Sequence, residues 1–243
     1  PGSDSRGELY NDDPVTQDAR FCGTTASMCG IEAALFEKND EKLERGIRED
    51  LMLHAYMLTQ SGIPMLYSSD EVGRLNDYSY KDDPDKAADS RYIHRGAFQW
   101  DLAKKRKSKT SVEGQIFQTL SRMEQIRRQE SVFDKDCDVY TYDVHDDSIL
   151  CILRQKGNER FIGIFNFSDS EKTAWMKLSV ISSQARLWSL RMWRFRLMDL
   201  CGVRECNLFC GMTLSLISGQ NSGSAGNYEN ILFTSRLIYC SIF

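Results

Sequence analysis

Two adjacent carboxylates, Asp70 and Glu71, follow a short apolar run within residues 61–77 (SGIPMLYSSDEVGRLND). Carboxylates in such a place could act as acid and base, accept hydrogen bonds, or hold a loop in position. Neighbouring side chains of an extended backbone point to opposite sides, so one aimed at a substrate leaves the other aimed elsewhere. The pair therefore does not favour a two-carboxylate mechanism, and we expect Asp70 and Glu71 to anchor a loop near a site.

Arginines mark two further segments. Residues 89–95 (DSRYIHR) carry Arg91 and Arg95, and the weaker motif at 14–23 (PVTQDARFCG) carries Arg20. The planar guanidinium fork suits a carboxylate or vicinal hydroxyls. The alternative for 89–95 is a surface salt-bridge cluster with nearby aspartates, namely Asp82, Asp83 and Asp89.

Two other patterns invite a chemical role that their context does not support. The triplet His145-Asp146-Asp147 lies between two alternating segments, where Asp-Asp is typical of a hairpin turn. Eight cysteines are present, and three of them form a loose cluster at Cys201, Cys206 and Cys210 without a CxxC motif. We expect free thiols; a zinc site in that cluster is the alternative, although structural zinc favours tighter ligand spacing. No phosphate loop, GxGxxG, GxSxG or HExxH motif occurs, so no cofactor or metal is expected.

The sequence between residues 23 and 128 predicts the elements that position these residues. Residues 23–36 are small and apolar, like a tightly packed helix, and 48–60 place Leu51, His54, Ala55 and Leu58 on one helical face. Residues 63–67 (IPMLY) are apolar throughout, which predicts a strand buried on both faces, as in a parallel sheet. A long polar loop (68–111) and a second amphipathic helix (112–128) follow, while residues 1–20 are interpreted as an irregular loop.

From residue 132 the hydrophobic period shortens toward two. Segments 137–143, 148–154 and 160–167 predict a three-stranded antiparallel meander, with turns at Asp146-Asp147 and Gly157-Asn158. Beyond about residue 176 no confident signal of a fold remains.

The whole chain has 243 residues, a formal net charge of −4, 41 % apolar and 27 % charged residues. These values are typical of a globular protein. No apolar run is long enough to span a membrane, and the acidic balance gives no electrostatic footprint for a nucleic acid. We therefore expect neither partner. The chain begins at Pro1, so we expect a processed start or a piece of a longer protein and assign no compartment; cytoplasmic is only a default.

Five segments together resemble one enzyme family. GIPMLYSSDEVGRLND resembles the eighth-strand segment of the α-amylase superfamily of glycoside hydrolases, usually G-x-P-x-[IL]-Y-x-G-[DE]-E. Its continuation D-E-V-G-x-L-N-D and the later D-S-R-[WY]-x-H-R look specifically like amylosucrases. QDARFCGTTAS, GQIFQTLSRMEQIRRQESVF and FIGIFNFSD are similar to three further segments of that subfamily and occur in the family's order, so the resemblance covers about residues 8–175.

The resemblance implies a fold and an activity. Amylosucrases are (β/α)8-barrel retaining transglucosidases that cleave sucrose through a covalent β-glucosyl intermediate, release fructose and extend an α-1,4-glucan. Retaining chemistry needs a carboxylate nucleophile and a general acid/base. In the family these follow the fourth and fifth strands, and a stabilising H-D-D aspartate follows the seventh. All three precede the segments matched here, so His145-Asp146-Asp147 is not that motif and we expect this chain alone to be inactive.

The family's residue roles transfer to few positions. Arg91 matches the arginine that closes the glucosyl pocket by pairing with an upstream aspartate, and Arg20 matches an arginine on the acceptor side. Three residues depart from the pattern: Ser69 replaces Gly, Tyr92 replaces Trp, and Gly96 replaces Pro.

We therefore expect an α/β plus β chain: the C-terminal end of a (β/α)8 barrel (1–131), an antiparallel β-domain (132–176, or up to 217) and a divergent tail (177–243), for which misread sequence is the alternative. The expected partners are sucrose, α-glucan and the missing N-terminal barrel half. A sucrose hydrolase or α-glucosidase of the same superfamily, and a non-catalytic glucan-associated fragment, are the alternatives in function.

Overall fold

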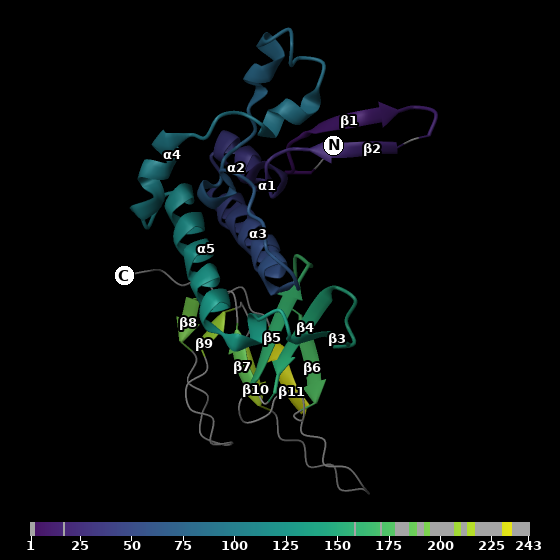
Figure 1. Ribbon diagram of the computed structural model, residues 1–243, viewed down its shortest axis with the longest axis vertical. Helices are drawn as coiled ribbons and strands as arrows, with labels where there is room; N and C mark the ends of the chain where they lie inside the picture. Colours follow the sequence, from purple (N-terminus) through teal and green to yellow (C-terminus); the bar gives the residue numbers. More distant parts are fainter. Residues whose placement is uncertain are drawn as a thin grey trace, which may run out of the picture. The chain divides into compact units, whose positions relative to one another are not determined.

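The computed structural model describes residues 3–16, 18–157, 159–170 and 172–177, together with short strands farther on (Figure 1). The described residues divide into two compact units. The first contains the residues up to Leu58 together with Ile63–Ile126, and the second contains Thr59–Gly62 and the described residues from Arg127 onward.

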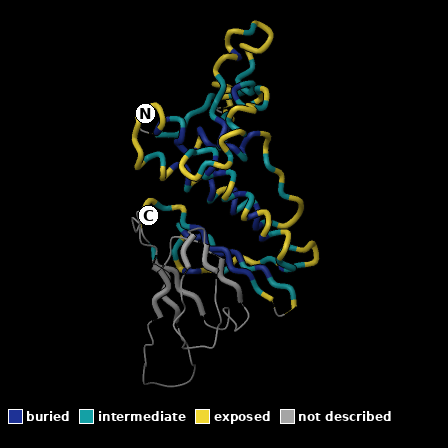
Figure 2. The backbone as a smooth tube through the Cα atoms, turned by 90° about the vertical axis from the view of Figure 1, so that its left-hand side faces the viewer, coloured by how far each residue is buried: buried dark blue, intermediate teal, exposed yellow. Residues whose placement is uncertain are grey.

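Two long helices organise the first unit, α3 (Asp40–Thr59) and α5 (Val112–Gln129). The predicted face of α3 is confirmed, because Leu51, His54, Ala55 and Leu58 are all buried. The helix begins at Asp40, earlier than the predicted residue 48. Its charged first turns stay exposed, whereas Ile47 is buried. The helix predicted at 112–128 is also confirmed. Buried positions follow the helices, and loop tips are exposed (Figure 2).

The single helix predicted at 23–36 is wrong. Two short helices form instead, α1 (Thr25–Met28) and α2 (Ile31–Glu37). Gly30 separates them with φ +87°, a backbone conformation that L side chains rarely adopt and that interrupts a helix.

The buried strand predicted at 63–67 is also wrong. These residues form neither a helix nor a strand, and Ile63 and Met65 are 91 % and 81 % exposed. A strand exists only when neighbouring backbones accept and donate its hydrogen bonds. Within the described residues, no neighbouring strand pairs with this segment.

Residues 1–20 were expected to be irregular, yet they contribute an antiparallel hairpin of β1 (Glu8–Asp13) and β2 (Asp18–Cys22). Its outer positions are exposed and polar, so the strands lack the alternation that sequence patterns detect. Long-range contacts hold it: the carboxylate of Glu8 accepts from the Tyr80 hydroxyl and pairs with Lys81 at 2.5 Å.

The polar loop at 68–111 contains only helical turns. These are the 3-10 turns η1 (Asp70–Val72), η2 (Tyr78–Asp82) and η3 (Ser90–His94), the short helix α4 (Trp100–Lys104) and the 3-10 turn η4 (Lys105–Lys107).

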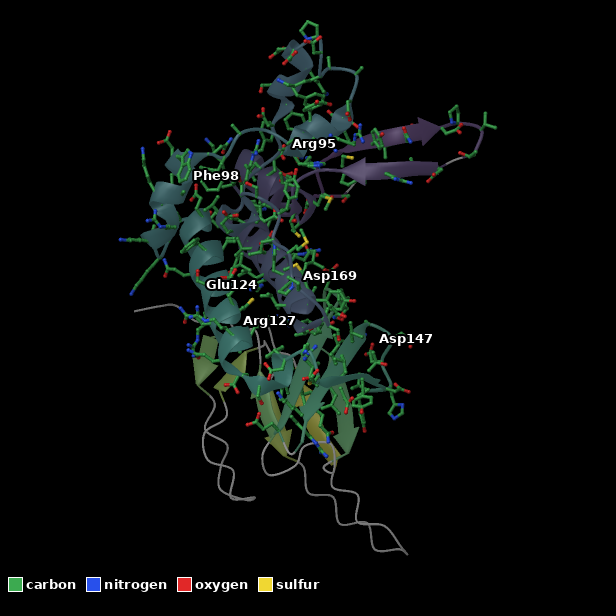
Figure 3. The ribbon with its side chains drawn as sticks, viewed as in Figure 1. Arg95, Phe98, Glu124, Arg127, Asp147 and Asp169 are labelled. Atoms are coloured by element: carbon green, nitrogen blue, oxygen red, sulfur yellow. The ribbon has the colours of Figure 1, made fainter. Side chains whose placement is uncertain are left out.

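The second unit begins with η5 (Ser131–Phe133) and a four-stranded sheet of order β3-β4-β5-β7. The meander is confirmed: β3 (Asp138–Tyr142), β4 (Ile149–Lys156) and β5 (Glu159–Asn166) pair antiparallel in succession. The fourth strand, β7 (Ala185–Trp188), joins β5 in parallel. The His145-Asp146-Asp147 triplet lies in the β3–β4 turn, where Figure 3 labels Asp147.

Two smaller sheets complete the described part of this unit. The first has the order β10-β11-β6, with β6 at Thr173–Lys177, β10 at Thr213–Leu216 and β11 at Asn230–Thr234. The second pairs β8 (Met192–Arg194) with β9 (Asn207–Phe209). Most of the predicted tail at 177–243, including the cysteine cluster, lies outside the described residues.

Two further findings concern the described residues alone. The cysteines among them, Cys22, Cys29, Cys137 and Cys151, are free thiols. None of the helices there is long and apolar enough to cross a bilayer.

Candidate functional site: the interlocked motif loops

Asn76 connects three of the segments that carry the sequence motifs. Its Oδ1 accepts from the backbone N–H of Thr24 at 2.9 Å, and its own backbone N–H donates to Ser27 Oγ at 2.9 Å. Its Nδ2 donates to the Arg6 carbonyl at 3.1 Å. The next residue, Asp77, donates its N–H to the carbonyl of Ile93 in the 89–95 motif at 2.8 Å. Asn76 and Asp77 together thus fix the 17–27, 61–77 and 89–95 segments to one another.

Arg74 makes a second connection between the loops. It is buried, and its Nη1 donates to the Gly96 carbonyl at 2.6 Å. A Cβ on residue 96 would lie 2.1 Å from Arg74 Nη2. The arginine therefore fills the space that a side chain at position 96 would need.

Arg91 lies against two groups of the first unit. Its Nε and Nη2 donate to both oxygens of Asp89, at 2.7–3.1 Å, and its guanidinium lies over the Tyr10 ring at 4.4 Å. The hydrogen bonds that Asp89 accepts from the Arg91 side chain lower the pKa of Asp89 to about 2. Among the described residues, Asp89 is thus the carboxylate partner of Arg91. Asp83 of the predicted salt-bridge cluster pairs with Lys86 instead.

Arg20 is exposed on β2, directly across the hairpin from Tyr10. Facing residues of an antiparallel pair place their side chains on the same face of the sheet. The Arg20 side chain therefore lies on the same face of the hairpin as Tyr10, the ring over which the Arg91 guanidinium lies. The η3 turn holds the hairpin through the Ser90 hydroxyl, which donates to the Leu9 carbonyl at 2.8 Å.

Asp70 and Glu71 lie in the η1 turn and not in the extended backbone that was predicted, and their surroundings differ. Asp70 is buried in η1 and accepts from the Thr25 hydroxyl at 3.1 Å, whereas Glu71 is half-buried. His54 of α3 lies between two carboxylates, with Nε2 3.7 Å from Asp70 and Nδ1 3.4 Å from Asp50.

The charges in this triad determine the protonation of His54. Burial by itself lowers the pKa of His54, but the Asp50 and Asp70 carboxylates outweigh it and raise the pKa to about 10. Burial raises the pKa of Asp50. The raised pKa favours the protonated imidazole, whose Nε2 next to Asp70 joins α3 to the loop that carries this carboxylate.

The site combines arginine forks, a tyrosine ring and loop carboxylates. Such groups can stack against and hydrogen-bond a polar ligand rich in hydroxyls. Among the described residues, no group of three or more histidines, cysteines and carboxylates is placed to hold a metal ion.

Sequence reasoning missed three participants: Asn76, Tyr10 and the Asp50–His54 pair. Asn76 lies within the 61–77 motif, so the sequence marked the segment although not the hydrogen bonds that this residue makes. The role of Tyr10 depends on the hairpin, and that of Asp50 on burial, for which the sequence carries no separate signal.

No family model matches this sequence. Solved structures that the chain resembles belong to the α-amylase superfamily. They include AmyP in complex with maltose (16 % identity, covering 80 % of this chain and 36 % of that chain, TM-score 0.47). The α-amylase from H. orenii has 14 % identity over 80 % of this chain and 34 % of its own, with a TM-score of 0.41. The trehalulose synthase MutB from Pseudomonas mesoacidophila MX-45 has 15 % identity over 77 % of this chain and 38 % of its own, with a TM-score of 0.40.

This chain thus spans little more than a third of the length of the proteins that it resembles. At such identities and TM-scores the likeness carries no argument about activity, and the function proposed below rests on the motifs and the geometry of the chain itself.

Proposed function

We propose that this chain is the C-terminal part of a sucrose-using, α-retaining glucosyltransferase similar to amylosucrases. The parent enzyme transfers the glucosyl group of sucrose to an α-1,4-glucan and releases fructose. In this proposal residues 1–131 complete a (β/α)8 barrel, 132–176 or up to 217 form the β-domain, and 177–243 are a divergent tail.

One observation carries the proposal. Three separate amylosucrase-like segments are fixed to one another through Asn76 and Asp77. Motif strings that matched by accident have no reason to share backbone and side-chain hydrogen bonds. Their interlocking supports a single loop assembly that the family resemblance explains.

The exposed segment at 63–67 supports the missing barrel half as a partner. Ile63, Met65 and Tyr67 are exposed and occupy alternate positions, which is the spacing of one face of a strand. Strands contributed by the upstream part of the parent would bury these side chains and accept the backbone hydrogen bonds.

The proposed mechanism is a double displacement. An upstream carboxylate attacks the anomeric carbon of the glucosyl group while the upstream acid protonates the departing fructose oxygen. A glucan hydroxyl then attacks the anomeric carbon of the glucosyl-enzyme and releases the carboxylate nucleophile. It gives its proton to the residue that served as the acid in the first step and now serves as the base. In this scheme Arg91 closes the glucosyl pocket, Arg20 lies on the acceptor side, and Asp70 and Glu71 anchor the loop.

The purified chain should release no fructose from sucrose, because the carboxylates that carry the reaction are upstream and enzymatic accelerations of about 10⁶-fold or more need a chemical source. Turnover above that of a heat-inactivated sample would contradict this. The positive test extends the chain upstream through the parent gene and assays sucrose with a glucan acceptor. The proposal expects fructose together with a lengthened glucan.

The same assay separates the alternatives. A sucrose hydrolase or α-glucosidase would release equal amounts of glucose and fructose without extending the glucan. A glucan-associated fragment would bind glucan although its gene encodes neither the nucleophile, the acid nor the H-D-D motif.

A further inference from the structure

A dense group of cations lies at the end of the polar loop. Five of the six residues at 104–109 are Lys or Arg, in a chain whose net charge is −4. We define the basic surface as these five residues and the exposed indole that precedes them: Trp100, Lys104, Lys105, Arg106, Lys107 and Lys109. Figure 3 shows side chains ending in nitrogen that project outward from this part of the chain, with Phe98 labelled beside it.

The backbone beneath these cations is fixed to α5. Gln118 Nε2 donates to the carbonyls of both Arg106 and Ser108, at 3.1 and 3.0 Å. A Cβ at position 114 would lie 1.8 Å from the Ser108 carbonyl oxygen, so only glycine lets the basic turn approach the helix this closely. A pre-organised backbone loses less conformational entropy on binding than a free loop does.

The charges of the basic surface are only partly neutralised. Lys104 pairs with Asp101 at 2.7 Å and Lys105 with Glu113 at 2.8 Å. No carboxylate of the described chain lies within ion-pair distance of Lys107 or Lys109. The exposed positive charge therefore exceeds the local negative charge.

An aromatic platform adjoins these charges. Trp100 is 74 % exposed, and the Phe98 ring meets it edge-on with centroids 4.8 Å apart. The carboxylate of Asp101 is 90 % exposed beside it. Within a few residues, the surface thus offers a flat ring, excess cations and a carboxylate that can accept hydrogen bonds from hydroxyl groups.

We propose that this basic surface binds an anionic polysaccharide, one that carries sulfate or carboxylate groups on its sugar rings. The C–H face of a sugar stacks on Trp100, Lys107 and Lys109 pair with the anionic substituents, and Asp101 accepts from sugar hydroxyls. The site lies outside the 17–27, 61–77 and 89–95 segments, and it does not depend on the proposed glucosyltransferase function.

The same features disfavour two other polyanions. An anionic bilayer needs a larger apolar face than one exposed indole. Single-stranded nucleic acid is bound by successive aromatic platforms along a basic groove, whereas one exposed ring adjoins the cations here.

The test titrates the full 243-residue chain with a heparin oligosaccharide, with polygalacturonate and with neutral glycogen by calorimetry at several salt concentrations. We expect binding to at least one of the two anionic glycans and an affinity for glycogen at least tenfold weaker. The two anionic probes distinguish sulfate from carboxylate as the recognised group. Binding that weakens as salt is added is expected, since each ion contact releases a counterion.

The variants separate charge from stacking. The double variant Lys107→Ser/Lys109→Ser should weaken binding about tenfold or more and flatten the salt dependence. Trp100→Ala should weaken it about fivefold with an unchanged salt dependence, and Trp100→Phe should recover most of the loss. The matched control, Arg128→Ser/Lys135→Ser, removes two exposed cations outside the surface and should stay within about twofold of the unmodified chain. Melting curves check that each variant is folded.

Three outcomes would overturn the proposal: no binding of either anionic glycan, equal binding of neutral glycogen, or tighter binding of an oligo-dT strand or of vesicles containing phosphatidylserine. An equal loss in the control variant would also overturn it, because binding would then follow net charge alone. Glucosyl transfer by the extended parent is measured separately, so failure of one proposal leaves the other standing.

Discussion

Replacing His54 with glutamine tests the buried charge triad most directly. His54 lies between the Asp50 and Asp70 carboxylates, and the chain buries all three side chains. The carboxylates raise the pKa of His54 to about 10, against about 6.5 in an unfolded chain. A group whose folded pKa is raised contributes stability that is complete below the unfolded pKa and is lost as the pH rises through the folded pKa. The window for His54 is therefore pH 6.5 to 10.

The magnitude follows from these two values. At about 1.4 kcal/mol per pH unit, the full contribution is roughly 5 kcal/mol, and about 3 kcal/mol of it should be lost between pH 6.5 and 9. The raised pKa of Asp50 acts in the same direction, because that group also loses stabilisation as the pH rises. His54→Gln should remove most of the decline.

The assay is urea unfolding followed by circular dichroism at 222 nm across this pH range. The helical signal reports mainly the first unit, since α3 and α5 are its long helices. Asp50→Asn should flatten the decline in part. His145→Gln, which changes an exposed histidine in the β3–β4 turn, is the matched control and should leave the slope unchanged. Equal slopes for the unmodified chain and His54→Gln would refute the reasoning.

Three other substitutions test separate contacts. Gly96→Ala should lower the free energy of unfolding by about 1–3 kcal/mol, because its Cβ meets Arg74. Adding Arg74→Thr to the same chain should relieve this loss. If the two changes in the free energy of unfolding simply add in this double-mutant cycle, the contact is contradicted. Arg154→Met should cost about 3 kcal/mol in urea unfolding, since this buried arginine donates to the Val132 and Thr59 carbonyls at 2.8 and 2.9 Å; an unchanged midpoint would show that the bonds are dispensable. In the extended parent, Arg91→Ala should cut sucrose turnover by orders of magnitude and Arg91→Lys nearly as much, because lysine lacks the bidentate fork. Near-normal kcat/KM for Arg91→Lys, with melting curves as the folding control, would assign Arg91 to a surface salt bridge.

The sequence by itself determined the elements whose signals are local. The helical spacing of Leu51, His54 and Leu58 predicted their buried face, and the two-residue period of 137–167 predicted the meander. Both patterns report which side of a single element faces the core. The turn at Asp146-Asp147 was predictable for the same reason, because its residues favour tight turns without distant partners.

Tertiary structure alone decided the features that depend on distant partners. The apolar run at 63–67 has the composition of a buried strand but lacks neighbouring strands among the described residues, and so it forms no strand and is exposed. The polar hairpin of β1 and β2 has no sequence signal, yet contacts to Tyr80, Lys81 and Ser90 hold it. Likewise, only the folded chain shows that the Arg91 guanidinium, paired with its near neighbour Asp89, lies over the distant Tyr10 ring. Hydrogen bonds and ion pairs between distant segments depend on where the rest of the chain lies, and no local pattern of residues encodes that.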